Sequence, residues 1–108
     1  HFFSGVLKNL IDWLSRPVSD KEPQVLSGKP AAISGISLGM YGTGIAQDHL
    51  VTLISFLNMD VMNMPRVTIP NAMQLMDSQG KLSLTDESYS YLKMQADAFV
   101  DFVRKRMK

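Results

Sequence analysis

The chain has 108 residues, no cysteine and a formal net charge of +1. This length suits one domain, and the lack of thiols excludes disulfides, cysteine nucleophiles and cysteine-based zinc sites. A charge this small gives no strong field for nucleic acid or an anionic membrane, and the most apolar run, 50–57, is far shorter than the ~20 residues of a membrane span. We therefore expect neither a nucleic-acid partner nor a membrane partner.

The first expected element is a helix that begins at Ser4 or Gly5 and runs to about Ser15, where Arg16-Pro17 ends it. Its apolar positions form two adjoining sides: Val6, Leu7, Leu10, Ile11, Trp13 and Leu14. A helix that is apolar on two sides is either deeply buried or covered by another subunit. Lys8 and Asp12, one turn apart, are expected to pair on the remaining surface.

A strand covered on both faces is expected at 31–37, because this stretch is apolar or small throughout and follows Lys29-Pro30. A turn rich in glycine, 37–44, leads from it into a helix whose apolar residues have helical spacing: Ala46, Leu50, Leu53, Ile54 and Leu57. Ligands of open α/β sheets bind at such turns. The glycine order matches neither the dinucleotide fingerprint nor a P-loop, so a ligand loop and a simple tight turn are both open at this point.

The remaining elements are a split strand and a long helix. Extended residues on either side of Pro65 predict an edge strand or a bulge, followed by a helical turn at 71–76 and a tight turn at 77–80. Thr85 is expected to cap a helix with basic residues at its end and apolar residues at three- and four-residue steps: Tyr89, Leu92, Ala96, Phe99, Val100, Val103 and Met107. The eight methionines are interpreted as core filler.

This order of elements predicts an α/β fold with right-handed βαβ units and a parallel sheet. A strand that is apolar on both faces needs a neighbour on each side, and the sequence offers only one. We therefore expect further strands outside these residues. The start at His1-Phe2-Phe3, with neither an initiator Met nor the basic residues of a signal peptide, fits a fragment.

With these elements in place, the stretch Gly5-Val-Leu-Lys-Asn-Leu-Ile-Asp-Trp-Leu-Ser-Arg-Pro17 resembles the PG-x-LKNAIDW-x-SRP signature of the flavodoxin-like NADPH-dependent FMN reductases. That family includes quinone, azo-dye and chromate reductases. Segments 26–47 and 77–82 also resemble it in register. Two departures stand out: Ser4 replaces the usual Pro, and Thr43-Gly44-Ile45 replaces Gly-Ala-Arg, which removes a cation that could pair across subunits and makes a tetramer less expected than a dimer.

The resemblance implies an α/β, flavodoxin-like three-layer fold. Residues 1–108 would be the C-terminal portion of one such domain, with about three helices and two parallel strands but without the first three strands and the phosphate loop. The implied function is an NAD(P)H-dependent FMN reductase that passes hydride from nicotinamide through FMN to an acceptor such as a quinone. It would be cytoplasmic and a homodimer or higher homo-oligomer. These 108 residues alone are expected to be inactive, and the alternative is a flavodoxin-like module that binds flavin or a partner without turnover.

By the same resemblance, the cofactor contacts lie in two flavin loops. These contacts are Ser37, Leu38, Gly39, Met40, Tyr41, Gly42, Phe2 and Phe3. Ordinary loop packing is an equal alternative for Met40 and Tyr41. FMN carries the hydride chemistry, with NADPH or NADH as donor, so no catalytic side chain is expected. No metal is expected, and adjacent Asp48 and His49 point apart on a helix, which excludes a triad with Ser37.

Overall fold

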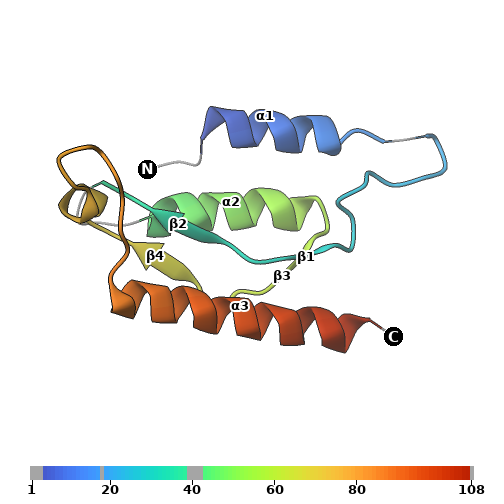
Figure 1. Ribbon diagram of the computed structural model, residues 1–108. Helices are drawn as coiled ribbons and strands as arrows, with labels where there is room; N and C mark the ends of the chain where they lie inside the picture. The colour runs from blue at the N-terminus through green and yellow to red at the C-terminus, as the bar shows by residue number, and fades with distance from the viewer. Residues whose placement is uncertain (1–3, 18, 39–42, 108) are drawn as a thin grey trace. The chain divides into compact units, whose positions relative to one another are not determined.

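The computed structural model describes residues 4–17, 19–38 and 43–107. The chain divides into two compact units, which are described separately. The first unit takes in residues up to 31 together with 45–61, and the second takes in 32–44 together with 62–108. Figure 1 shows the elements in chain order.

The first unit holds helix α1 (Gly5–Leu14), strand β1 (Pro30–Ala31), helix α2 (Gly44–Phe56) apart from its first residue, and strand β3 (Asp60–Val61). The α1 helix begins where the sequence predicted, because the Ser4 hydroxyl accepts a hydrogen bond of 3.1 Å from the Leu7 N–H. Strands β1 and β3 pair in parallel. The predicted α2 helix is also confirmed.

A small set of hydrogen bonds fixes how α2 turns into β3. Asn58 follows α2 in the left-handed conformation, with φ of 64°. Its carbonyl accepts from the Gly28 N–H at 2.7 Å, and its side-chain amide donates to the Ser27 hydroxyl at 3.0 Å. Gln24 Nε2 donates to the Leu57 carbonyl at 2.6 Å. The loop before β1 and the end of α2 are thereby tied together, and this sets β1 beside β3.

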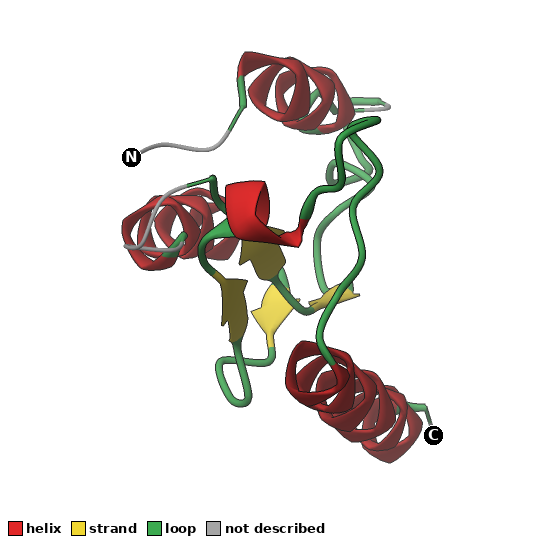
Figure 2. Ribbon diagram, turned by 60° about the vertical axis from the view of Figure 1, so that its left-hand side comes forward, coloured by secondary structure: helices red, strands yellow, loops and turns green. Residues whose placement is uncertain are grey.

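The second unit holds strand β2 (Ser34–Ile36), strand β4 (Val67–Ile69), the short 3₁₀ helix η1 (Ala72–Leu75) and the long helix α3 (Asp86–Arg106). Strands β2 and β4 pair in parallel, and α3 packs against β4 (Figure 2). The predicted cap is confirmed, because the Thr85 hydroxyl accepts from the Ser88 N–H at 3.1 Å. The turn at 77–80 is also present, with Asp77 Oδ1 accepting from the N–H groups of Gln79 and Lys81.

The expectation of one strand at 31–37, covered on both faces, is wrong. The stretch forms two short strands separated by Ala32 and Ile33, and in β2 the side chains of Ser34 and Ile36 are exposed. The reason lies in the partner stretch: Pro30 pairs with Asp60, thirty residues further on, whereas Ser34 pairs with Val67, thirty-three residues further on. Three extra residues must bulge out between β3 and β4, so the pairing cannot continue without a break.

The buried amide of Gln95 compensates for this break. The residue is only 7% exposed, and its Nε2 donates to the Ile33 carbonyl at 2.7 Å and to the Pro65 carbonyl at 3.2 Å. Both carbonyls belong to the interrupted stretches and have lost regular strand partners. A polar residue therefore sits at the centre of the packed side of α3, because it supplies donors that an apolar residue could not.

The predicted apolar face of α3 is accordingly only partly correct. Leu92, Phe99 and Val103 are sheltered, but four predicted members are exposed: Tyr89, Ala96, Val100 and Met107. The packed side is turned toward Gln95, and it also takes in three residues that the prediction omitted: Ser88, Ala98 and Phe102. The prediction used only the spacing of apolar residues along the helix. It therefore could not identify a buried side of α3 whose central residue carries an amide.

The interpretation of the methionines as core filler is wrong for most of those described. Met62 is buried, but several others are more than half exposed: Met64, Met73, Met94 and Met107. Large apolar side chains also lie at the surface of other elements, so the apolar content of the sequence exceeds what these residues bury among themselves. None of the helices within the described ranges is both long and apolar enough to cross a bilayer.

We predict that Gln95→Leu lowers the free energy of unfolding by about 1–3 kcal/mol, because the carbonyls of Ile33 and Pro65 lose their donor. The measurement is urea denaturation followed by circular dichroism. Gln74→Leu is the matched control, because Gln74 is exposed on η1 and its replacement should change stability by less than about 0.5 kcal/mol. Equal effects of the two substitutions would contradict the role given to Gln95.

Candidate functional site

The carboxyl ends of β2 and β4 lie side by side in the second unit, because the strands are parallel and end on the Ile36–Ile69 pair. Hydrogen bonding continues beyond the strands. The Ser37 N–H donates to the Ile69 carbonyl at 2.9 Å, and the Ala72 N–H donates to the Ser37 carbonyl at 2.9 Å. The chain after β2 is thus held to β4 by the Ser37 N–H and to η1 by the Ser37 carbonyl. This edge is where open α/β sheets place their ligands.

Gly35 and Thr43 fix the other end of the turn between β2 and α2. A Cβ atom placed on Gly35 would collide with the Thr43 hydroxyl oxygen and would lie only 3.0 Å from its Cβ. Thr43 therefore packs directly on the backbone of β2, at a position where only glycine leaves room. This contact and the bonds of Ser37 hold both ends of the segment 38–43 on the same strand.

Apolar surface is exposed along this edge of the second unit. Leu38 is 61% exposed and Ile36 is 42% exposed. An open groove of about 380 Å³ runs along β2, and its other lining residues are Ile69, Leu82, Leu84 and Leu92. Such a surface offers close backbone approach and a flat apolar contact rather than an acid or a base, which suits a ligand that brings its own chemistry.

The structure describes two of the predicted cofactor contacts. Ser37 is half-buried and bonded as stated, and Leu38 extends from it toward solvent. The other six lie outside the described residues: Phe2, Phe3, Gly39, Met40, Tyr41 and Gly42. All eight contacts with flavin therefore stay predictions.

The sequence analysis missed the contact between Gly35 and Thr43. A usable signal was present, because a glycine inside a strand commonly marks close approach of another group to the backbone. On α2, His49 is exposed, as a residue of the helix surface would be. Within the described ranges, no three His, Cys, Asp or Glu side chains are grouped as metal ligands would be.

Two parallel strand pairs connected through α2, with a segment rich in glycine after β2, define an α/β protein that has its candidate ligand loop at that edge. A model of the NADPH-dependent FMN reductase family matches residues 1–74, which include this turn. The chain belongs to that family, and its fold is of the flavodoxin-like α/β class.

Three curated relatives illustrate the match. An NAD(P)H-dependent FMN reductase of Pseudomonas aeruginosa is 44% identical over 94% of this chain and 52% of its own length. A 2-hydroxy-1,4-benzoquinone reductase of a Burkholderia species is 38% identical over 94% of this chain and 54% of its own. An NADPH:quinone oxidoreductase of Arabidopsis thaliana is 37% identical over 89% and 48%. The chain thus spans about half the length of the curated relatives it matches.

We predict that Gly35→Ala destabilises the protein by about 1–3 kcal/mol, because the new methyl group must displace Thr43. In a Thr43→Gly background the same substitution should lose much of its effect, and the two changes should therefore be non-additive in a double-mutant cycle of urea denaturation. Gly5→Ala is the control: nothing lies within 4 Å of its Cβ position in α1, so it should be neutral or slightly stabilising. An additive cycle would refute the contact.

Proposed function

We propose that the protein is an NAD(P)H-dependent FMN reductase that passes hydride from the nicotinamide through FMN to an acceptor such as a quinone. The observation that carries the proposal is the turn after β2, which lies in the part of the chain that the family model matches. The names of the relatives support it, because they include FMN reductase, benzoquinone reductase and quinone oxidoreductase.

The described edge of the site fits a flavin. A flat ring needs close approach to the backbone and an apolar surface. The turn begins at a strand whose Gly35 admits close packing, and Leu38 and Ile36 expose apolar side chains there. We propose that Ser37, Leu38 and the residues from Gly39 to Gly42 contact the flavin ring, and that Phe2 and Phe3 are further cofactor contacts.

FMN would supply the hydride chemistry when bound, with Ser37 and Leu38 among the residues that would hold it. The role of the protein would be to bind FMN and to shelter it from water. The Ser37 peptide, bonded at both its N–H and its carbonyl, is held rigidly, so the residues that follow start from a fixed point. Leu38 would cover part of the ring, and peptide N–H groups near the ring would stabilise the negative charge that develops on it.

The rest of the proposal concerns the whole protein. We propose a homodimer or higher homo-oligomer in the cytoplasm, with residues 1–108 as the C-terminal portion of one domain. NADPH or NADH is the electron donor. The phosphate group of FMN would be held outside this portion, so the 108 residues alone should bind FMN weakly.

The test uses the product of the gene that encodes this chain. It should be yellow after purification with FMN, and it should oxidise NADPH or NADH faster when a quinone is added. Leu38→Asp should weaken FMN binding at least tenfold, about 1.4 kcal/mol, because it places a carboxylate against the ring. The control is Val100→Asp, on the exposed side of α3, which should leave FMN affinity unchanged.

Fluorescence quenching of FMN measures the affinity, and absorbance at 340 nm follows the nicotinamide. A protein that binds FMN without oxidising either nicotinamide would instead be the non-catalytic flavin-binding module. A protein indifferent to FMN would refute the proposed function.

A further inference from the structure

Asn71 joins β4 to η1 in a backbone conformation that most residues avoid. Its φ is 59° and its ψ is 40°, which lie in the left-handed region. Glycine enters this region freely, and asparagine is one of the few other residues that are enriched there. Among the described residues, the Asn71 side chain makes no hydrogen bond that caps η1. The feature of Asn71 that the fold uses is therefore its backbone conformation.

The turn at Asn71 directs the N–H of the next residue back toward the end of β2. The Ala72 N–H donates to the Ser37 carbonyl at 2.9 Å and so holds the peptide group between Ser37 and Leu38. The C=O and N–H of a trans peptide lie on opposite sides of one plane. The bond from Ala72 thus also points the Leu38 N–H away from η1, and it sets the orientation of the first peptide after β2 that leads into the proposed flavin contacts.

The donor belongs to a short helix that is held at its other end as well. The Ser83 N–H donates to the Leu75 carbonyl at 3.0 Å, and the Asp77 N–H donates to the Lys81 carbonyl at 2.9 Å. Ala72 itself is only 4% exposed. Because η1 is fixed at both ends, a different φ at residue 71 would move the Ala72 N–H off the Ser37 carbonyl.

We propose that Asn71 is a positioning residue for the flavin site: its left-handed conformation places the Ala72 N–H on the Ser37 carbonyl, and FMN affinity depends on the peptide orientation that results. This inference rests on the proposed function and adds a residue that lies outside the predicted cofactor contacts. A segment already held in its binding conformation loses less conformational entropy when the ligand binds. Release of this peptide should therefore weaken FMN binding even though Ser37 and Leu38 are unchanged.

The test compares Asn71→Gly, Asn71→Ala and Asn71→Val in the whole product of the gene. Glycine keeps the left-handed conformation, alanine tolerates it less well, and a β-branched valine is the least compatible with it. We expect Asn71→Val to raise the Kd of FMN at least about fivefold, with Asn71→Ala between it and the native protein. Asn71→Gly should stay within about twofold of the native Kd, because the conformation is kept without the amide. Fluorescence quenching of FMN is the measurement.

A second readout needs no flavin, so failure of the hydrogen-bond arrangement is distinguishable from failure of the proposed function. Amide hydrogen exchange is followed by NMR in protein without FMN. In Asn71→Val and Asn71→Ala the Ala72 amide should exchange faster relative to the Ser37 amide, by at least about tenfold for valine. The Ser37 N–H is the internal reference, because it donates to the Ile69 carbonyl and that bond does not involve η1.

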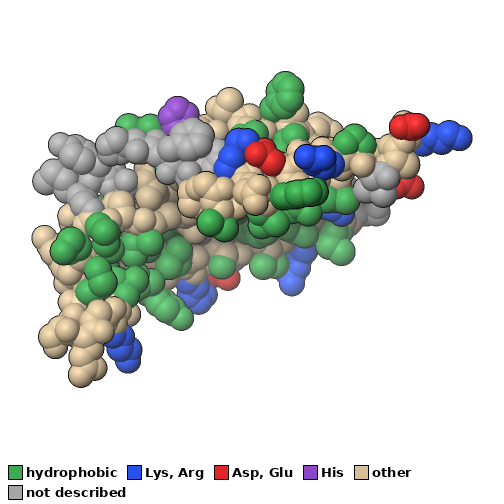
Figure 3. Space-filling view, turned by 90° about the horizontal axis from the view of Figure 1, so that it is seen from above, with side chains coloured by type: hydrophobic (Ala, Val, Ile, Leu, Met, Phe, Trp, Pro, Cys, Tyr) green, Lys and Arg blue, Asp and Glu red, His purple; other side chains and the backbone are tan. Residues whose placement is uncertain are grey.

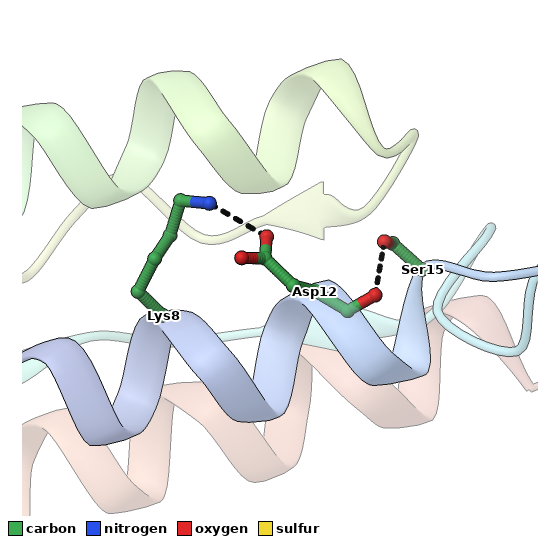
Figure 4. A network of polar contacts seen from close by, with 3 residues as sticks. All are labelled: Lys8, Asp12 and Ser15. Carbon is green, nitrogen blue, oxygen red and sulfur yellow. Dashed lines mark hydrogen bonds and ion pairs between the residues drawn. The ribbon is translucent and has the colours of Figure 1, made fainter.

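Two control substitutions separate this role from a general loss of stability. Thr85→Ala removes the cap of α3 and should lower stability while leaving the Kd of FMN within about twofold of native. Asp12→Asn changes the pair predicted on α1, which is present: Lys8 Nζ contacts Asp12 Oδ1 at 2.6 Å, and the Ser15 hydroxyl donates to the Asp12 carbonyl at 2.7 Å (Figure 4). An exposed pair contributes little to stability, so both readouts should stay at the native level.

Three results would overturn the proposal. The first is a native Kd of FMN in Asn71→Ala and Asn71→Val despite faster exchange of the Ala72 amide. The second is a loss of affinity in Asn71→Gly as large as in Asn71→Val, which would assign the effect to the amide. The third is an equal loss in Thr85→Ala, which would assign it to stability alone.

Discussion

The register of parallel pairing constrains the second unit more than any other feature. Three extra residues between β3 and β4 have to be accommodated before β2 and β4 can pair. At that break the Ile33 and Pro65 carbonyls accept hydrogen bonds from the side-chain amide of Gln95. The position of Gln95 also determines which side of α3 faces the strands. Without those donors, two polar groups would be buried at a cost comparable to several ordinary packing contacts.

The candidate site depends on this arrangement because it begins where β2 and β4 end. Once Ser34 is paired with Val67, Ser37 reaches the Ile69 carbonyl and η1. Thr43 can then return over Gly35 because that position lacks a side chain. The described ends of this segment, Ser37 and Thr43, are therefore held by backbone hydrogen bonds and by close packing. Such a scaffold suits a ligand that supplies its own reactivity and needs from the protein a rigid, sheltered surface.

The described residues expose a large amount of apolar surface (Figure 3). The chain spans about half the length of its relatives, and its larger apolar side chains outnumber those it buries.

The sequence by itself determined the helices, the split strand around Pro65, the cap at Thr85 and the family, because these depend on local periodicity, hydrogen bonding and a long specific motif. Only the tertiary structure decided that the stretch at 31–37 forms two strands, that α3 packs around Gln95, and that Thr43 rests on Gly35. The first two features arise from pairing and hydrogen bonding between residues thirty or more positions apart, and neither a local pattern nor a count of apolar residues contains that information. The third depends on which side chain packs on Gly35, and a glycine inside a strand indicates a close approach without naming the group that makes it.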